Sequence, residues 1–118
     1  MEEIRTYFET FVKMPDDDWK LFASKLIEQH FPKKSILVQA GKVENYLSFI
    51  AKGAVRFYIP RLEDEFTFNF SFSKDFVSAY DSFLTRNPSS YAVEAMVDTI
   101  VWRISYEDLE EIYKTTKI

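Results

Sequence analysis

The sequence predicts a small, mainly β domain with helices at both ends, and three observations lead to this prediction. Aromatic residues make up 18% of the 118 residues, with 12 Phe and 7 Tyr, and such residues favour strands. Apolar residues alternate with a period of two through the middle of the chain, which is typical of strands. Helical spacing is confined to the two ends. A chain of this length forms one domain.

Two helices are predicted at the N-terminal end. The first, over residues 2–14, has an apolar stripe at helical spacing, formed by Ile4, Tyr7, Phe8, Phe11 and Val12. Pro15 ends it, because the residue before a proline is kept out of the helical region. The acidic run at 16–18 supplies N-cap oxygens and negative charge for a second helix, from about Trp19 to Gln29. Its inward residues would be Trp19, Phe22, Leu26 and Ile27.

From Ser35 the apolar period changes to two, and about seven short strands are expected. The pattern places six of them, at 36–38, 46–51, 54–59, 65–72, 91–97 and 99–104. Gly41 and Gly53, the only glycines, fall at turns between strands. A helical turn is expected at 80–85, and Ser105 with Asp108 forms a capping box for a last helix through about Lys114. The predicted fold is an antiparallel β-roll, or jelly roll, with flanking helices.

The segment Glu65–Phe72 shows the clearest strand pattern in the chain. Its even-numbered positions are all phenylalanine, at 66, 68, 70 and 72, with Thr67, Asn69 and Ser71 between them. We therefore expect the four rings on one face, buried against the rest of the sheet. The alternative is an exposed aromatic platform on which a sugar or a base would stack.

Composition excludes several classes of function. The formal net charge is −4 and Lys33–Lys34 is the only adjacent basic pair, so we expect no DNA binding by this chain itself. There is no cysteine, and a single histidine, His30, is too few for a histidine metal site. The acidic start does not resemble a signal peptide, and no apolar run is long enough for a membrane helix, so the expected location is the cytoplasm. Nucleophile, phosphate-loop and dinucleotide motifs are absent, so neither an enzyme nor a cofactor is expected.

Several segments, in the same order, resemble one family. Residues 45–58, NYLSFIAKGAVRFY, are similar to the start of a cyclic-nucleotide-binding domain, where a strand ends in Lys-Gly. Residues 74–76, Lys-Asp-Phe, resemble the Gly-Asp-Phe before the phosphate-binding cassette, and residues 87–95 resemble the cassette's exit, normally Pro-Arg-Ser-Ala. The leading helices and Gln29 to Lys34 are similar to a divergent branch of the catabolite-activator/Fnr regulators. The resemblance covers residues 2–115 and implies a β-roll of the cyclic-nucleotide-binding type.

The cassette departs from the family pattern at the positions that carry its chemistry. A cyclic-nucleotide site has a Gly-Glu pair, the Glu holding the ribose, and an Arg on the cyclic phosphate; here these positions are Ser78, Ala79 and Ser89. Losing both charged partners is expected to weaken cyclic AMP binding at least about 100-fold. The predicted ligand pocket, by alignment, comprises Ser78, Ala79, Tyr80, Arg86, Ser89 and Ser90. The alternative is that its hydroxyls satisfy only loop backbone and that Arg86 is solvated.

The resemblance implies the ligand-sensing domain of a bacterial transcription regulator that does not respond to cyclic AMP. Its effector would be an unknown small molecule, and DNA would be bound only through a helix-turn-helix domain that residues 1–118 do not contain. The expected organisation is N-terminal helices at 1–31, a β-roll at 35–104 and a helix at 105–115. The full-length regulator would be a homodimer without membrane contact. The alternative is a stand-alone module that binds a small molecule or carbohydrate by aromatic stacking.

Overall fold

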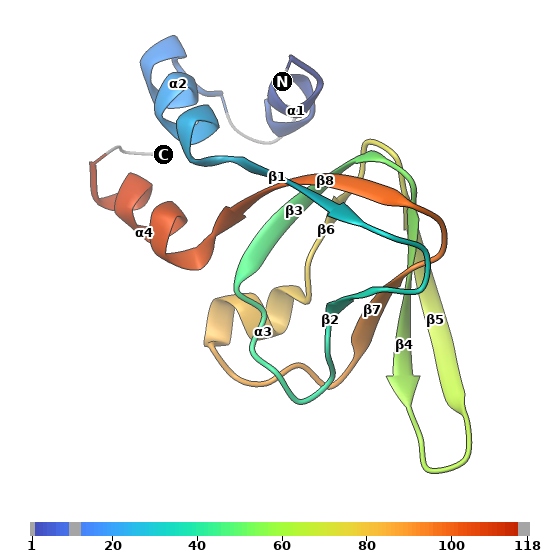
Figure 1. The fold of residues 1–118 in the computed structure, drawn as a ribbon. Coiled ribbons are helices and arrows are strands. Elements are labelled where there is room, and N and C mark those ends of the chain that lie inside the picture. Colours follow the sequence, from blue (N-terminus) through green and yellow to red (C-terminus); the bar gives the residue numbers. More distant parts are fainter. Residues whose placement is uncertain (1, 10–12, 116–118) are drawn as a thin grey trace.

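The structure, a computed structural model, describes residues 2–9 and 13–115. Within them eight strands form two four-stranded sheets, in the orders β1-β8-β3-β6 and β2-β7-β4-β5, with antiparallel pairing (Figure 1). The predicted mainly β roll with flanking helices is confirmed. The elements are α1 (Glu2–Phe8), α2 (Asp16–Lys25), β1 (Ile27–Phe31), β2 (Ile36–Val38), β3 (Tyr46–Lys52), β4 (Ala54–Pro60), β5 (Glu65–Phe72), β6 (Phe76–Val77), α3 (Tyr80–Thr85), β7 (Ala92–Ala95), β8 (Thr99–Ser105) and α4 (Tyr106–Thr115).

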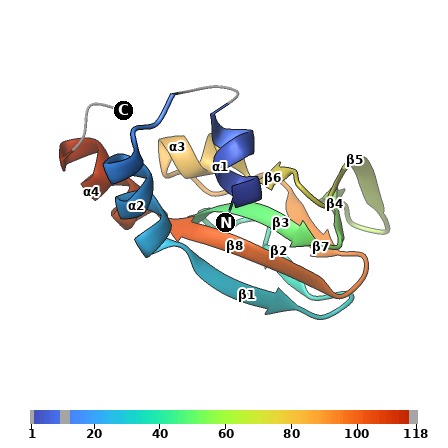
Figure 2. The same cartoon turned by 90° about the horizontal axis from the view of Figure 1, so that it is seen from above.

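Two apolar cores lie on opposite faces of the sheet β1-β8-β3-β6. On β8, Val101 belongs to the core between the two sheets, whereas Ile104 belongs to the core under the helices. This follows from the two-residue alternation of a strand that is buried on both faces. Figure 2 shows α1, α2 and α4 together on the helix side of this sheet. The helices therefore cover the face of this sheet that is turned away from the other sheet.

The N-terminal prediction is wrong at the end of the second helix. α2 ends at Lys25, Leu26 is already extended with ψ 136°, and residues 27–31 form β1, which pairs with β8. Ile27 is consequently exposed rather than inward, and His30 lies in a strand rather than at a helix end. The reason is tertiary, because pairing along the edge of β8 outweighs a local helix preference. Phe11 and Val12 of the predicted first stripe lie outside the described residues.

The helix starts differ in how they are capped. Ser105 Oγ accepts a hydrogen bond from the backbone N–H of Asp108 at 3.1 Å, so the predicted N-cap of α4 is confirmed. For α2 the N-cap residue is Pro15, with no side-chain cap. The acidic run therefore supplies charge in the first turn but no cap, and Asp16 instead accepts a hydrogen bond from Arg5 at 2.6 Å.

A β-bulge in β5 overturns the expectation of four phenylalanines on one buried face. Phe57 pairs with Asn69 but Tyr58 pairs with Thr67, which leaves Phe68 as an extra residue. One extra residue reverses the facing of everything beyond it. Phe68 and Phe66 therefore lie on the face of Phe57, while Phe70 and Phe72 lie on the opposite face, where Phe70 is paired with Arg56.

The four rings are also exposed, at 49%, 44%, 46% and 57% for residues 66, 68, 70 and 72. β5 is the edge strand of its sheet, and Figure 1 shows the β4–β5 hairpin projecting from the roll, away from the helices. A two-stranded projection has little of the protein to cover it on either face. The period of the sequence thus identified the strand but not its burial.

Candidate functional site

The predicted cassette residues lie between β6 and α3, at the start of α3 and in the loop that leads to β7. Ser78 precedes α3, and its Oγ donates hydrogen bonds to Glu44 Oε1 at 3.2 Å and to the Tyr46 carbonyl at 3.0 Å. Ala79 is fully buried in the core between the sheets, whereas Tyr80 is 54% exposed. The segment therefore turns its first two predicted residues inward and the third outward.

The loop after α3 lines a cavity of about 290 Å³. Of the six predicted pocket residues, Ser89 and Ser90 contribute to its wall, whereas Ser78, Ala79, Tyr80 and Arg86 do not. Ser89 is buried, and its Oγ donates to the Tyr91 carbonyl at 2.7 Å and accepts from the Tyr91 N–H at 3.2 Å. At the position where the family pattern has arginine, this chain therefore has a short hydroxyl already used by its own backbone.

Arg86 does not point into this cavity. It follows α3 in the left-handed conformation, with φ 63°, and caps the helix end. Its guanidinium donates to the carbonyls of Glu44 and Phe83, each at 3.0 Å, and to Asn45 Oδ1 at 2.6 Å. It also stacks on Tyr106, 3.9 Å from the ring centroid. Arg86 therefore ties α3 to the β2–β3 loop and does not line the cavity that contains Ser89.

Three aromatic rings pack together beside the cassette loop. Tyr91 and Phe68 are in edge contact with centroids 5.3 Å apart, and each lies near Phe57, at 6.1 and 6.2 Å. The Tyr91 hydroxyl accepts a hydrogen bond from the backbone of Tyr80, and burial, the main cause, raises the pKa of Tyr91. The first backbone amide of α3 is thus already engaged by a side chain of the domain.

Sequence reasoning missed a polar cluster at the β2–β3 loop, which is hydrogen-bonded to the cassette through Ser82 and Ser89. Glu44, in the β2–β3 loop, is 6% exposed, and burial raises its pKa to about 7. Ser78 and the backbone amides of Ala79 and Tyr46 donate hydrogen bonds to its carboxyl group. Its own N–H donates to Ser82 Oγ at 2.9 Å. Nothing in the local sequence distinguishes this residue from an ordinary exposed loop glutamate.

Arg103 on β8 belongs to the same cluster. Its guanidinium lies 3.7 Å from the Tyr46 ring centroid and 5.5 Å from that of Phe31. Its Nε is buried, and no described residue accepts a hydrogen bond from it. Burial lowers the pKa of this arginine, although Glu44 and Tyr46 act in the opposite direction. The signal was available, because strand alternation puts Arg103 on the same face as Val101.

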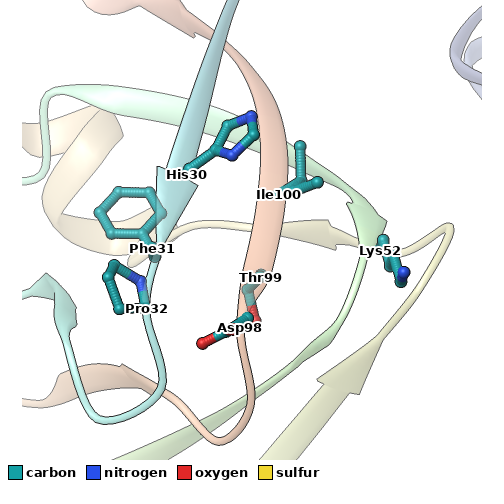
Figure 3. Close-up of a pocket in the computed structure, with 7 residues that line it drawn as sticks. All are labelled: His30, Phe31, Pro32, Lys52, Asp98, Thr99 and Ile100. Carbon is teal, nitrogen blue, oxygen red and sulfur yellow. The ribbon is translucent and has the colours of Figure 1, made fainter.

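A further depression of about 320 Å³ lies where β1 ends and β8 begins. Figure 3 shows His30 and Ile100 on these neighbouring strands, Asp98 at the turn before β8, and Lys52 standing apart at the end of β3. Asp98 accepts a hydrogen bond from the backbone N–H of Lys33 at 2.9 Å. Its visible role is therefore to hold the β1–β2 turn.

The described part of the chain also bears on two other features, metal sites and membrane-spanning helices. No group of three or more metal-ligating side chains occurs among the residues that the structure describes. Across the same residues, no helix has the length and apolar character needed to cross a membrane.

Comparison with known proteins decides the family. The model of the cyclic nucleotide-binding domain matches residues 28–116, which is most of the chain. This chain belongs to the cyclic nucleotide-binding domain family. Comparison with the curated proteins finds no match. The predicted resemblance and fold class are therefore confirmed.

Solved structures share the fold at low identity. A cyclic nucleotide-binding domain from Methylobacillus flagellatus matches 98% of this chain and 67% of its own, with TM-score 0.86 and 18% identity. The catabolite activator protein of Thermus thermophilus matches 89% of this chain and 49% of its own, with TM-score 0.75 and 20% identity. The regulator CLP of Xanthomonas campestris matches 86% and 49%, with TM-score 0.70 and 18% identity. This cyclic nucleotide-binding domain thus spans about half the length of both regulators.

Proposed function

We propose that this cyclic nucleotide-binding domain is the ligand-sensing part of a bacterial transcription regulator and that it does not respond to cyclic AMP. The observation that carries the second half is Ser89, whose hydroxyl is bonded to the Tyr91 backbone where a phosphate-binding arginine would stand. A cyclic phosphate brought into this loop would meet no cation, and burying an unpaired anion is costly.

The alternative sources of positive charge are already engaged. Arg86 is held by two carbonyls, Asn45 and the Tyr106 ring, so moving it to the loop would break all of these contacts. The backbone amides at the start of α3 donate to Tyr91 and Glu44. These commitments support a cassette that has lost its phosphate function and been rebuilt for packing.

The regulatory context rests on the relatives. Thermus thermophilus catabolite activator protein has the same fold, and the Xanthomonas protein is named as a c-di-GMP-responsive global regulator, so the fold serves effectors other than cyclic AMP. We propose that a separate helix-turn-helix domain binds DNA, that the full-length regulator is a homodimer in the cytoplasm, and that the domain has no catalytic role. Within this scheme residues 1–118 form a single sensing domain.

Titration calorimetry with cyclic AMP and cyclic GMP tests the proposal. The expected dissociation constants are weaker than about 100 μM, because both charged partners of the nucleotide are missing. Adding the cation alone, as Ser89→Arg, is expected to improve binding, whereas Thr85→Arg on the same cavity wall is the matched control and should not. Micromolar binding of either nucleotide by the unmodified domain would refute the proposal.

The exposed phenylalanines support a second candidate, a module that stacks a planar ligand or sugar. All four rings of β5 are at least 44% exposed, as such a platform requires. The bulge, however, divides them between two faces, so no face carries more than two of them. Titration with a short oligosaccharide, read by β5 amide shifts in NMR spectra, would detect such binding. We prefer the sensing domain.

A further inference from the structure

A second pocket opens between β2 and the sheet that contains β8, beside the Ser89 loop, where the Ser89 N–H donates a hydrogen bond to the Lys42 carbonyl at 2.8 Å. It has a volume of about 310 Å³. Its wall combines apolar side chains, among them Leu37 and Val38, with Lys42 at the loop and Arg103 at the strand. None of its lining residues belongs to the cavity lined by Ser89 and Ser90. We refer to it as the Arg103 pocket.

Arg103 is the unusual group in this pocket. A buried N–H without an acceptor costs stability, so such groups are rare unless a ligand or water completes them. Here Nε has no acceptor among the described residues, and two aromatic rings hold the guanidinium on its faces. The rings fix its orientation but leave its hydrogen-bonding edge unsatisfied. The pocket therefore presents an oriented cation that lacks an anion.

Glu44 lines the same pocket and interacts electrostatically with Arg103, but the two side chains form no ion pair. Among the described residues, no ion pair joins Arg103 to any carboxylate. The Glu44 carboxyl is instead held by Ser78 and by two backbone amides, and at neutral pH its raised pKa leaves it only partly charged. Lys42, exposed in the loop before Glu44, adds a second positive charge at the entrance.

We propose that the Arg103 pocket binds a small molecule with a carboxylate group, which pairs with Arg103, and a short apolar body, which lies against Leu37 and Val38. A planar guanidinium matches a planar carboxylate through two parallel hydrogen bonds. A phosphate dianion fits less well, because one buried cation cannot offset two negative charges beside Glu44. The volume is at the lower end of the roughly 300–1,000 Å³ typical of small-molecule sites.

The position of the pocket gives this ligand a route to the rest of the domain. Glu44 links the pocket to Ser78 through its carboxyl group, to Ser82 through its N–H and to Arg86 through its carbonyl. All three partners flank or belong to α3. An anion beside Arg103 would change the charge that Glu44 experiences and so act on α3. As the effector site of a sensor this inference rests on the proposed function, whereas the binding itself does not.

Calorimetry with benzoate tests the binding, with benzamide as the neutral probe of the same shape and inorganic phosphate as the alternative oxyanion. Benzoate is expected to bind at submillimolar concentration and benzamide at least about tenfold more weakly, because only benzoate pairs with the cation. Arg103→Gln should weaken benzoate at least about tenfold. Arg61→Gln, which removes an exposed arginine of the β4–β5 loop, is the matched control and should leave binding unchanged.

The substitution Glu44→Gln should change the benzoate affinity in the opposite direction from Arg103→Gln. Removing a neighbouring negative charge should tighten benzoate at pH 8, by at least about twofold, whereas general damage to the pocket would weaken it. NMR spectra of the unmodified domain locate the site even if Arg103→Gln fails to fold. The largest benzoate-induced shifts should be those of the amides of residues 42–46 and 103, with smaller shifts in α3, which is hydrogen-bonded to Glu44.

Four results would overturn the inference: no benzoate binding, equal binding of benzamide, tighter binding of phosphate, or shifts confined to 81–91. Cyclic AMP titration is independent of these outcomes. Tight cyclic AMP binding would refute the proposed function without touching the Arg103 pocket, and absent benzoate binding would do the reverse.

Discussion

Glu44 should make the domain less stable as the pH rises. Burial raises its pKa from 4.5 to about 7 in the folded protein, since the charged form is poorly solvated there. Between these two pH values the folded state binds more protons than the unfolded state, so the free energy of unfolding falls with increasing pH. At about 1.4 kcal/mol per pH unit, the full difference gives a loss of about 3 kcal/mol above pH 7.

The groups around Glu44 each raise or lower the pKa of its carboxyl group. Arg103 on β8 stabilises the carboxylate, as do the hydrogen bonds from Ser78 and two backbone amides, and all of these lower the pKa of Glu44. Tyr91 experiences the Glu44 charge from the β7 side, where that charge helps raise the pKa of Tyr91. Desolvation is the largest of these effects, so the net shift is upward.

Urea unfolding at pH 5 and pH 8 measures this effect. Wild type should lose about 2–3 kcal/mol more than Glu44→Gln between these pH values. The comparison removes any pH-independent cost of the substitution. Glu63→Gln, which removes a carboxylate from the exposed β4–β5 loop, is the matched control and should follow wild type. An identical pH dependence in wild type and Glu44→Gln would refute the reasoning.

Three further predictions concern packing and charge. Gly53→Ala should lower the thermal midpoint clearly more than Gly41→Ala. Both glycines have positive φ, but a Cβ at position 53 would lie 2.8 Å from Thr99 Cα, whereas a Cβ at position 41 would have no atom within 4 Å. Equal losses in the two variants would exclude the steric explanation. Phe68→Ala should lower the free energy of unfolding in urea by about 1–2 kcal/mol, and Phe70→Ala by less than about 1 kcal/mol, since of these two residues only Phe68 packs on two other rings. The reverse order would show that the bulge is not at Phe68. With a net charge of −4, the domain should show no saturable binding to a random DNA duplex by fluorescence anisotropy at low salt, and micromolar binding would contradict this.

Local chemistry in the sequence was sufficient for the outline of the domain. Alternating apolar residues located β3, β4, β5 and β8 to within a residue or two, and the Ser105 cap located the start of α4. Gly53 was correctly assigned to a turn, between β3 and β4. These features depend on neighbours in the chain, which is why the sequence reveals them. The order of the motifs also identified the family, which the match over residues 28–116 confirms.

Tertiary structure alone decided which of these elements are buried and which residues of the site contact one another. The bulge at Phe68 depends on the register between β4 and β5, and one inserted residue reversed the facing of half the aromatic pattern. Ile27–Phe31 became a strand because the edge of β8 was available to pair with it. Glu44 and Arg103 are separated by 58 intervening residues, as their numbers show, and meet only when β3 and β8 pair. Strand alternation places Arg103 on the inner face of β8, but the raised pKa of Glu44 and the unsatisfied Nε–H of Arg103 depend on such distant contacts, so no local pattern could have indicated them.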